Sequence, residues 1–192
     1  MPDTATLIRF IVTTLLLELT PGPNMAFLIT LAAVQGRAAG LAMVAGIAVG
    51  LSVIGLAAAF GLATIAAREP VLMQGLTLAG VAYLVWLAWE AWRDAGDGDA
   101  VGADGADGAR AVRPAGVWFG RGLIMNLLNP KAAVFYLTVL PAAIGPQASA
   151  DSRSIGPVLL LTAVAVAIAT GVHLALALAA GTIHGLMADR AR

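Results

Sequence analysis

The sequence predicts an all-α, polytopic integral membrane protein, and three observations support this. Hydrophobic residues make up 60% of the chain and charged residues 11%, which is far more apolar than a soluble domain of this length. Five apolar segments are each long enough to cross about 30 Å of hydrocarbon as a helix. Two of them are interrupted by proline motifs, a pattern typical of the discontinuous helices in transporters.

The five predicted spans cover residues 5–34, 38–66, 70–92, 116–144 and 155–187. The first and fourth are longer than a modest tilt requires, and their internal prolines account for the excess. Hydrophobic sequence resumes directly after Asn24, so we expect the first segment to be a retained span rather than a cleaved signal peptide.

We expect a single transporter domain over residues 1–192, with a first half of three spans (1–92) and a second half of two (116–192). The connector 93–115 repeats Gly, Ala and Asp and cannot bury enough apolar surface to become ordered. Its Asp spacing does not fit a calcium-binding EF-hand loop. It is therefore predicted to be a flexible cytoplasmic linker.

The two interrupted spans resemble each other. When Pro21 is laid on Pro130, Phe27 falls on Tyr136 and Thr20 falls on Asn129. An odd number of spans in the first half makes such a repeat inverted. We expect the second half, with two predicted spans, to lack the last helix of the repeat.

Each interruption places a polar residue before a proline, Thr20 before Pro21 and Asn129 before Pro130. Both polar residues are favoured helix N-caps, and proline is favoured at the first helical position. A helix that starts inside the membrane offers free N–H groups and a partial positive charge to a carboxylate. The alternative is a proline kink that only shapes packing, but two capped breaks in matching positions favour binding. The predicted substrate-binding residues are Thr20, Pro21, Gly22, Pro23, Asn24, Asn126, Asn129, Pro130 and Lys131.

Two charges lie near the middle of the interrupted spans, Glu18 and Lys131. A charge at the centre of a membrane helix costs about 2.5 to 3.5 kcal/mol, so both should face a cavity or each other. In the functional interpretation Glu18 carries a proton or binds an amine, and Lys131 binds a carboxylate. In the alternative they form a structural ion pair. His173 is a second candidate for proton coupling, or else a hydrogen-bonded structural residue.

Several other classes of function find little support. The chain has no cysteine and two histidines, so we predict neither a metal site nor a cofactor. Its formal charge of zero gives no reason to expect nucleic-acid binding. An intramembrane enzyme would have to rely on Ser52 with His173, without a supporting motif, and we predict that the protein is not an enzyme. Transport of metal cations or other small ions would depend on Glu18 and Glu90.

Arginine placement predicts the orientation. With five spans, one side carries Arg37, Arg93, Arg110, Arg113, Arg190 and Arg192, and the other carries Arg68 and Arg153. The richer side should be cytoplasmic, which places the N-terminus outside. The motif Gly46-x-x-x-Gly50 permits close helix packing, either inside one subunit or between the subunits of a homo-oligomer.

Two motifs resemble the LysE/RhtB family of amino-acid exporters. The first is Leu19-Thr20-Pro21-Gly22-Pro23-Asn24 with the Gly36-Arg37-x-x-Gly40 turn, and the second runs from Phe119 through Arg121, Asn126 and Asn129 to Ala132. The resemblance implies a bacterial inner-membrane exporter of amino acids or close derivatives, driven by the proton gradient. From the two interrupted spans we expect alternating access at a midplane site. The chain departs from the family in its missing sixth helix and in the charge at Glu18.

Overall fold

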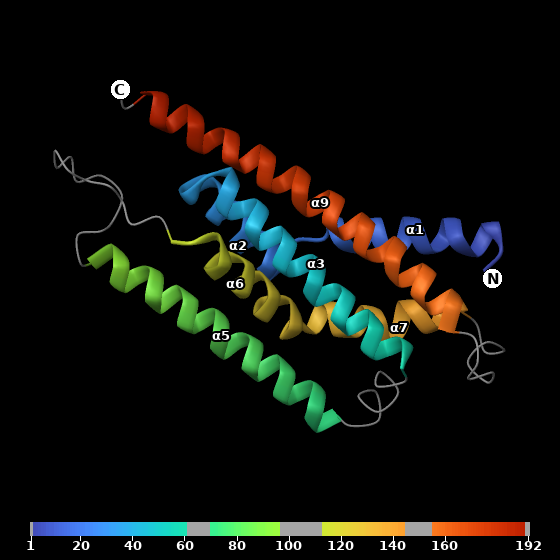
Figure 1. Ribbon diagram of the computed structural model, residues 1–192. Helices are drawn as coiled ribbons and strands as arrows, with labels where there is room; N and C mark the ends of the chain where they lie inside the picture. The colour runs from blue at the N-terminus through green and yellow to red at the C-terminus, as the bar shows by residue number, and fades with distance from the viewer. Residues whose placement is uncertain (1, 61–69, 97–112, 145–154, 191–192) are drawn as a thin grey trace.

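The computed structural model describes residues 2–60, 70–96, 113–144 and 155–190 of the protein (Figure 1). This part of the chain is all helical and contains no strand. Its helices are α1 (Thr4–Leu19), α2 (Pro23–Gln35), α3 (Arg37–Ala59), α5 (Pro70–Gly96), α6 (Ala115–Leu127), α7 (Pro130–Ile144) and α9 (Ile155–Arg190).

The helices confirm the predicted polytopic architecture. Three are long and apolar enough to cross a membrane on their own, within α3, α5 and α9. The pairs α1–α2 and α6–α7 meet the same test only together, and they bend by 59° and 52° at their breaks. Up to five spans result if each bent pair counts as one, and the two bends fall at the predicted proline motifs.

Both halves follow the same order, a broken pair and then a long helix. In Figure 1, α1 and α6 run in opposite directions through the bundle, and so do α3 and α9. This is the arrangement expected of an inverted repeat. The start of α3, the end of α5, the start of α6 and the end of α9 all lie toward one end of the bundle.

Some predicted boundaries shift. Helix α5 continues to Gly96, so the first residues of the predicted linker are helical. Helix α6 begins at Ala115, which is the last residue of the predicted linker. The remainder of that linker, residues 97–112, lies outside the described residues, as do residues 61–66 of the second predicted span. Among the arginines used to predict orientation, Arg68, Arg110, Arg153 and Arg192 also lie outside them.

Close backbone packing of α3 against α6 forms the centre of the bundle. A side chain at Gly46 would collide with the carbonyl of Phe119, and one at Gly122 would collide with the carbonyl of Met43. Only glycine fits at such approaches between helices. The sequence left open whether the close contact at Gly46 lies inside one subunit or between two, and the structure shows that it is made within one chain.

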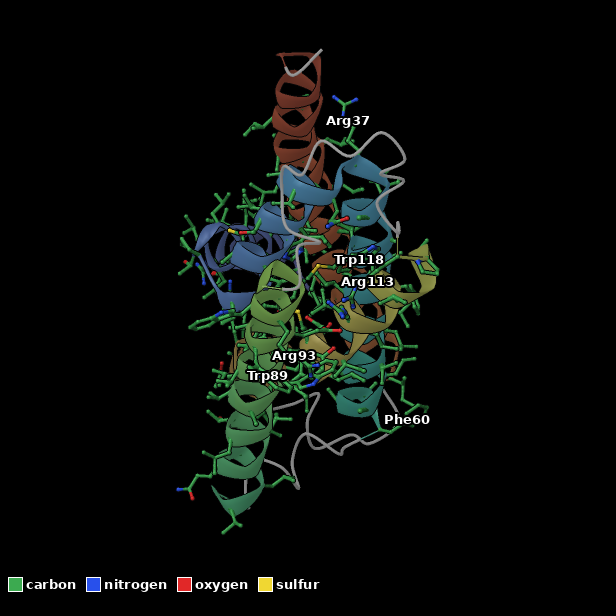
Figure 2. The ribbon with its side chains drawn as sticks, turned by 90° about the vertical axis from the view of Figure 1, so that its left-hand side faces the viewer. Arg37, Phe60, Trp89, Arg93, Arg113 and Trp118 are labelled. Atoms are coloured by element: carbon green, nitrogen blue, oxygen red, sulfur yellow. The ribbon has the colours of Figure 1, made fainter. Side chains whose placement is uncertain are left out.

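Helix α5 packs more loosely than α3. Its apolar window is 11% buried, against 39% for α3. Its contacts include Gly80, which approaches the carbonyl of Leu128, and Glu90, which accepts hydrogen bonds from Arg113 at 2.7 Å and Arg121 at 2.5 Å. Figure 2 shows Arg113 and Trp118 near each other beside the end of α5, where Arg93 also lies over Trp89 at 4.9 Å.

Candidate substrate-binding site

The two helix breaks meet at one cavity of about 360 Å³, which is within the range of about 300 to 1,000 Å³ typical of small-molecule sites. Its walls come from α1, α2, α3, α6, α7 and α9. Most of the predicted site residues line it: Glu18, Gly22, Asn24, Asn126, Asn129, Pro130, Lys131 and His173. The side chains of Thr20, Pro21 and Pro23 do not line it.

The first break differs from the prediction. Thr20 is the C-cap of α1, with its backbone N–H donating to the carbonyl of Leu17 and its hydroxyl donating to that of Leu16. Helix α2 starts at Pro23 after Gly22, which has no capping side chain. The prediction that Thr20 is an N-cap was therefore wrong. The cause is the second proline, which takes the first helical position of α2 and moves the cap two residues along the chain.

The second break confirms the prediction. The side-chain oxygen of Asn129 accepts a hydrogen bond of 3.0 Å from the backbone N–H of Lys131, and α7 starts at Pro130. This is the usual bond of a helix N-cap, which satisfies one of the orphan donors of the first turn.

Two hydrogen bonds join the breaks. The Lys131 ammonium donates to the backbone carbonyl of Thr20 at 3.0 Å, and the Asn24 amide donates to the Asn126 side-chain oxygen at 3.2 Å. Both amides are buried, with 6% and 2% of their surface exposed. The two interruptions therefore face each other.

Glu18 and Lys131 do not form the structural ion pair that we considered. Within the described residues both salt bridges are made by Glu90, with Arg113 and Arg121. Lys131 instead donates to a backbone carbonyl, because the end of α1 turns the Thr20 carbonyl toward it. The half-buried Glu18 carboxylate lines the same cavity and bonds to no other described residue.

Three buried polar atoms on the cavity walls lack a hydrogen-bond partner among the described residues. They are Thr14 Oγ1, Asn126 Nδ2 and His173 Nδ1. Leaving a buried donor or acceptor unpaired costs about 1 to 3 kcal/mol, and such groups normally bond to water or to a ligand. The cavity therefore offers unpaired polar atoms to which a polar ligand or water could bond.

Sequence reasoning missed part of the cavity wall. Thr14, Phe135, Tyr136, Ala165 and Ala169 line it as well. A helical signal for some of them was present, because residues four apart share one face of a helix. Thr14 precedes Glu18 by four positions, and Ala169 precedes His173 by four.

A comparison with models of known protein families gives one match over most of the chain. The model of the LysE type translocator family matches residues 15–191. No solved structure matches the chain.

Three curated relatives show the range of similarity. An uncharacterized membrane protein of Pseudomonas aeruginosa is 28% identical over 67% of this chain and 59% of its own length. The leucine efflux protein of Salmonella typhimurium is 27% identical over 67% and 58%. The homoserine/homoserine lactone efflux protein of Salmonella typhi is 32% identical over 72% and 64%. The matches cover less than two thirds of each relative. The chain is a multi-pass membrane protein that belongs to the LysE type translocator family.

Proposed function

We propose that the protein exports amino acids or close derivatives, using the cavity between the two helix breaks as its binding site. The observation that carries the proposal is the meeting of both breaks at a cavity that also holds one acidic and one basic side chain, Glu18 and Lys131. Membership of a family of translocators and the printed names of the efflux relatives support it.

The substrate carboxylate would bind at the helix starts. Gly22 provides no capping side chain for α2, which leaves the backbone N–H groups of Asn24 and Met25 without a cap. Such groups and the helix dipole favour an anion. Lys131 extends into the same cavity, and its ammonium has two donors left after its bond to the Thr20 carbonyl.

The substrate amine would bind Glu18, which has no other partner among the described side chains. Glu18 is also the candidate for coupling transport to the proton gradient, since a protonated carboxyl no longer attracts an ammonium. His173 on α9, which also lines the cavity, is the second candidate. These two residues would link proton uptake to substrate release.

Alternating access would follow from rocking one half against the other. The bonds Lys131 to Thr20 and Asn24 to Asn126 join the two halves at the breaks. A substrate carboxylate that drew Lys131 away from Thr20 would weaken one of these bonds. Binding and opening would then be coupled through the same ammonium.

The proposed location is the bacterial inner membrane with the N-terminus outside. Helix ends that carry Arg37, Arg93 and Arg113 share one end of the bundle (Figures 1 and 2), which would face the cytoplasm under the positive-inside rule.

No observation favours the two alternatives. Among the described residues, no three His, Asp or Glu side chains are grouped to hold a metal ion, and Glu90 is engaged by two arginines. Ser52 donates its hydroxyl to the Ala48 carbonyl and does not line the cavity with His173.

An efflux assay tests the proposal. Cells that express the protein are loaded with a panel of dipeptides, and the release of each amino acid is compared with that of cells carrying an empty vector. We expect faster release of at least one amino acid, and slower accumulation inside the cell. Equal release across the whole panel, with the protein present in the membrane, would contradict the proposal.

A further inference from the structure

We infer that the cavity selects amino acids with an uncharged, aliphatic side chain, and that Ala165 and Ala169 on α9 limit the size of that side chain. The inference rests on the proposed function and concerns the same cavity. It follows from how charge and volume are distributed along the cavity wall.

All the charged groups that line the cavity lie at the end next to the breaks. Glu18 is in the last turn of α1 and Lys131 is in the first turn of α7. His173 lines the cavity as well, and α9 approaches it from the end of the bundle toward which α7 runs (Figure 1). A zwitterion would be held here by its carboxylate and its ammonium.

The cavity becomes apolar away from the breaks. Helices α1 and α7 run side by side in this direction, since the rings of Phe10 and Phe135 lie 5.9 Å apart between centroids. One to two turns beyond Lys131, α7 contributes Phe135 and Val139, and one to two turns before His173, α9 contributes Ala169 and Ala165.

No charged side chain lines this apolar end among the described residues. Thr138 donates its hydroxyl to the carbonyl of Val134, and Thr14 offers one unpaired hydroxyl. A substrate with a charged side chain would place a third charge here without a partner, and burying an unpaired charge is strongly unfavourable. Lysine, arginine, aspartate and glutamate are therefore excluded as good substrates, whereas aliphatic side chains are accommodated.

Two alanines determine the cavity volume that is open to a substrate side chain. Ala165 and Ala169 are four residues apart on one face of α9, and both are buried, with 5% and 2% exposed, at the cavity wall. A longer side chain at either position would extend into the cavity and occupy the volume of a substrate side chain. Alanine and leucine have similar helix propensities, so such a change affects the cavity more than the helix.

The test is Ala169→Leu, with Ala167→Leu as the matched control on the exposed face of the same helix. Efflux is measured for alanine, leucine, phenylalanine, lysine and glutamate from dipeptide-loaded cells. For the parent protein we expect efflux of leucine and alanine but not of lysine or glutamate. Ala169→Leu should lower leucine efflux at least tenfold relative to alanine efflux, and Ala167→Leu should resemble the parent.

A second variant tests the inference in the opposite direction, and it keeps the test valid if Ala169→Leu does not fold. Val139→Ala enlarges the apolar end, so phenylalanine efflux should rise relative to alanine efflux. Thermal stabilisation of the purified proteins by each amino acid provides a separate measure of binding.

The outcomes separate this inference from the proposed function. If the parent exports no amino acid on the panel, the proposed function fails. Two results would contradict the selectivity but leave the proposed export function intact. One is that the parent exports lysine or glutamate best. The other is that Ala169→Leu and Val139→Ala leave the efflux rates of leucine and phenylalanine, each relative to that of alanine, unchanged.

Discussion

The two helix breaks come from the same kind of sequence, a polar residue followed by proline, but they differ in how the next helix begins. At the second break Asn129 caps α7 with its side chain. At the first, Thr20 closes α1 instead, and α2 begins at Pro23 without a side-chain cap. The comparison shows that a single extra proline decides whether the polar residue ends one helix or starts the next.

The breaks also carry opposite charges. Glu18 lies two residues before the Thr20 cap, and Lys131 lies two residues after the Asn129 cap. The uncapped start of α2 also lies near the basic break, because Lys131 bonds to the Thr20 carbonyl at the end of α1 and both Gly22 and Lys131 line the cavity. The uncapped helix start and the Lys131 ammonium thus lie at one junction, and the acidic group lines the same cavity.

The largest effect is expected for Lys131, which joins the two breaks. Lys131→Ala should abolish efflux because it removes both the charge and the bond to Thr20, while membrane abundance stays close to that of the parent. Lys131→Met keeps most of the stem and should be equally inactive. The measurements are dipeptide-driven efflux and immunoblotting of the membrane fraction. Loss of the folded protein in both variants would indicate that the bond from Lys131 to the Thr20 carbonyl is structural.

Glu18 should show a narrower defect. Glu18→Gln preserves shape and hydrogen bonding but fixes the neutral state, so the variant should bind substrate more weakly. At saturating substrate it should still exchange substrate across the membrane but fail to accumulate it against a gradient. Reconstituted vesicles with an imposed proton gradient provide the measurement, and exchange without a gradient is the internal control. Uphill transport at the parental rate and pH dependence would remove Glu18 from the coupling mechanism.

The cap of the second break predicts a moderate effect on stability. Asn129→Ala removes the acceptor for the Lys131 N–H, and loss of an N-cap costs about 0.5 to 2 kcal/mol. Asn129→Asp keeps an acceptor in the same place and should retain most of the stability. Thermal unfolding of the purified protein in detergent compares the two variants. Equal melting temperatures for the alanine variant and the parent would show that the cap adds nothing.

The smallest effect is expected at the first break. Thr20→Val removes only a hydroxyl that donates within its own helix, so the change in stability should stay within about 0.5 kcal/mol, as for most surface substitutions. The same unfolding measurement applies. If Thr20→Val proves as costly as Asn129→Ala, the two breaks are not different in the way described above.

The sequence by itself determined the membrane environment, the two interrupted spans and the polar residues at the interruptions. These depend on composition and on local backbone chemistry: apolar segments of bilayer length and prolines that stop one helix and start another. Both are properties of a short stretch of chain, which explains why Asn129 was predicted correctly as a cap.

Only the tertiary structure decided which groups become partners. It gave Lys131 the Thr20 carbonyl rather than Glu18, and it placed the Gly46 contact on α6 of the same chain. It also placed Ala165 and Ala169 on the cavity wall. Their spacing of eight and four residues from His173 puts them on its face of the helix, but the sequence does not show which face meets the cavity. Contacts between residues far apart in the sequence depend on how the helices pack, and helical periodicity alone leaves open which neighbour each face will meet.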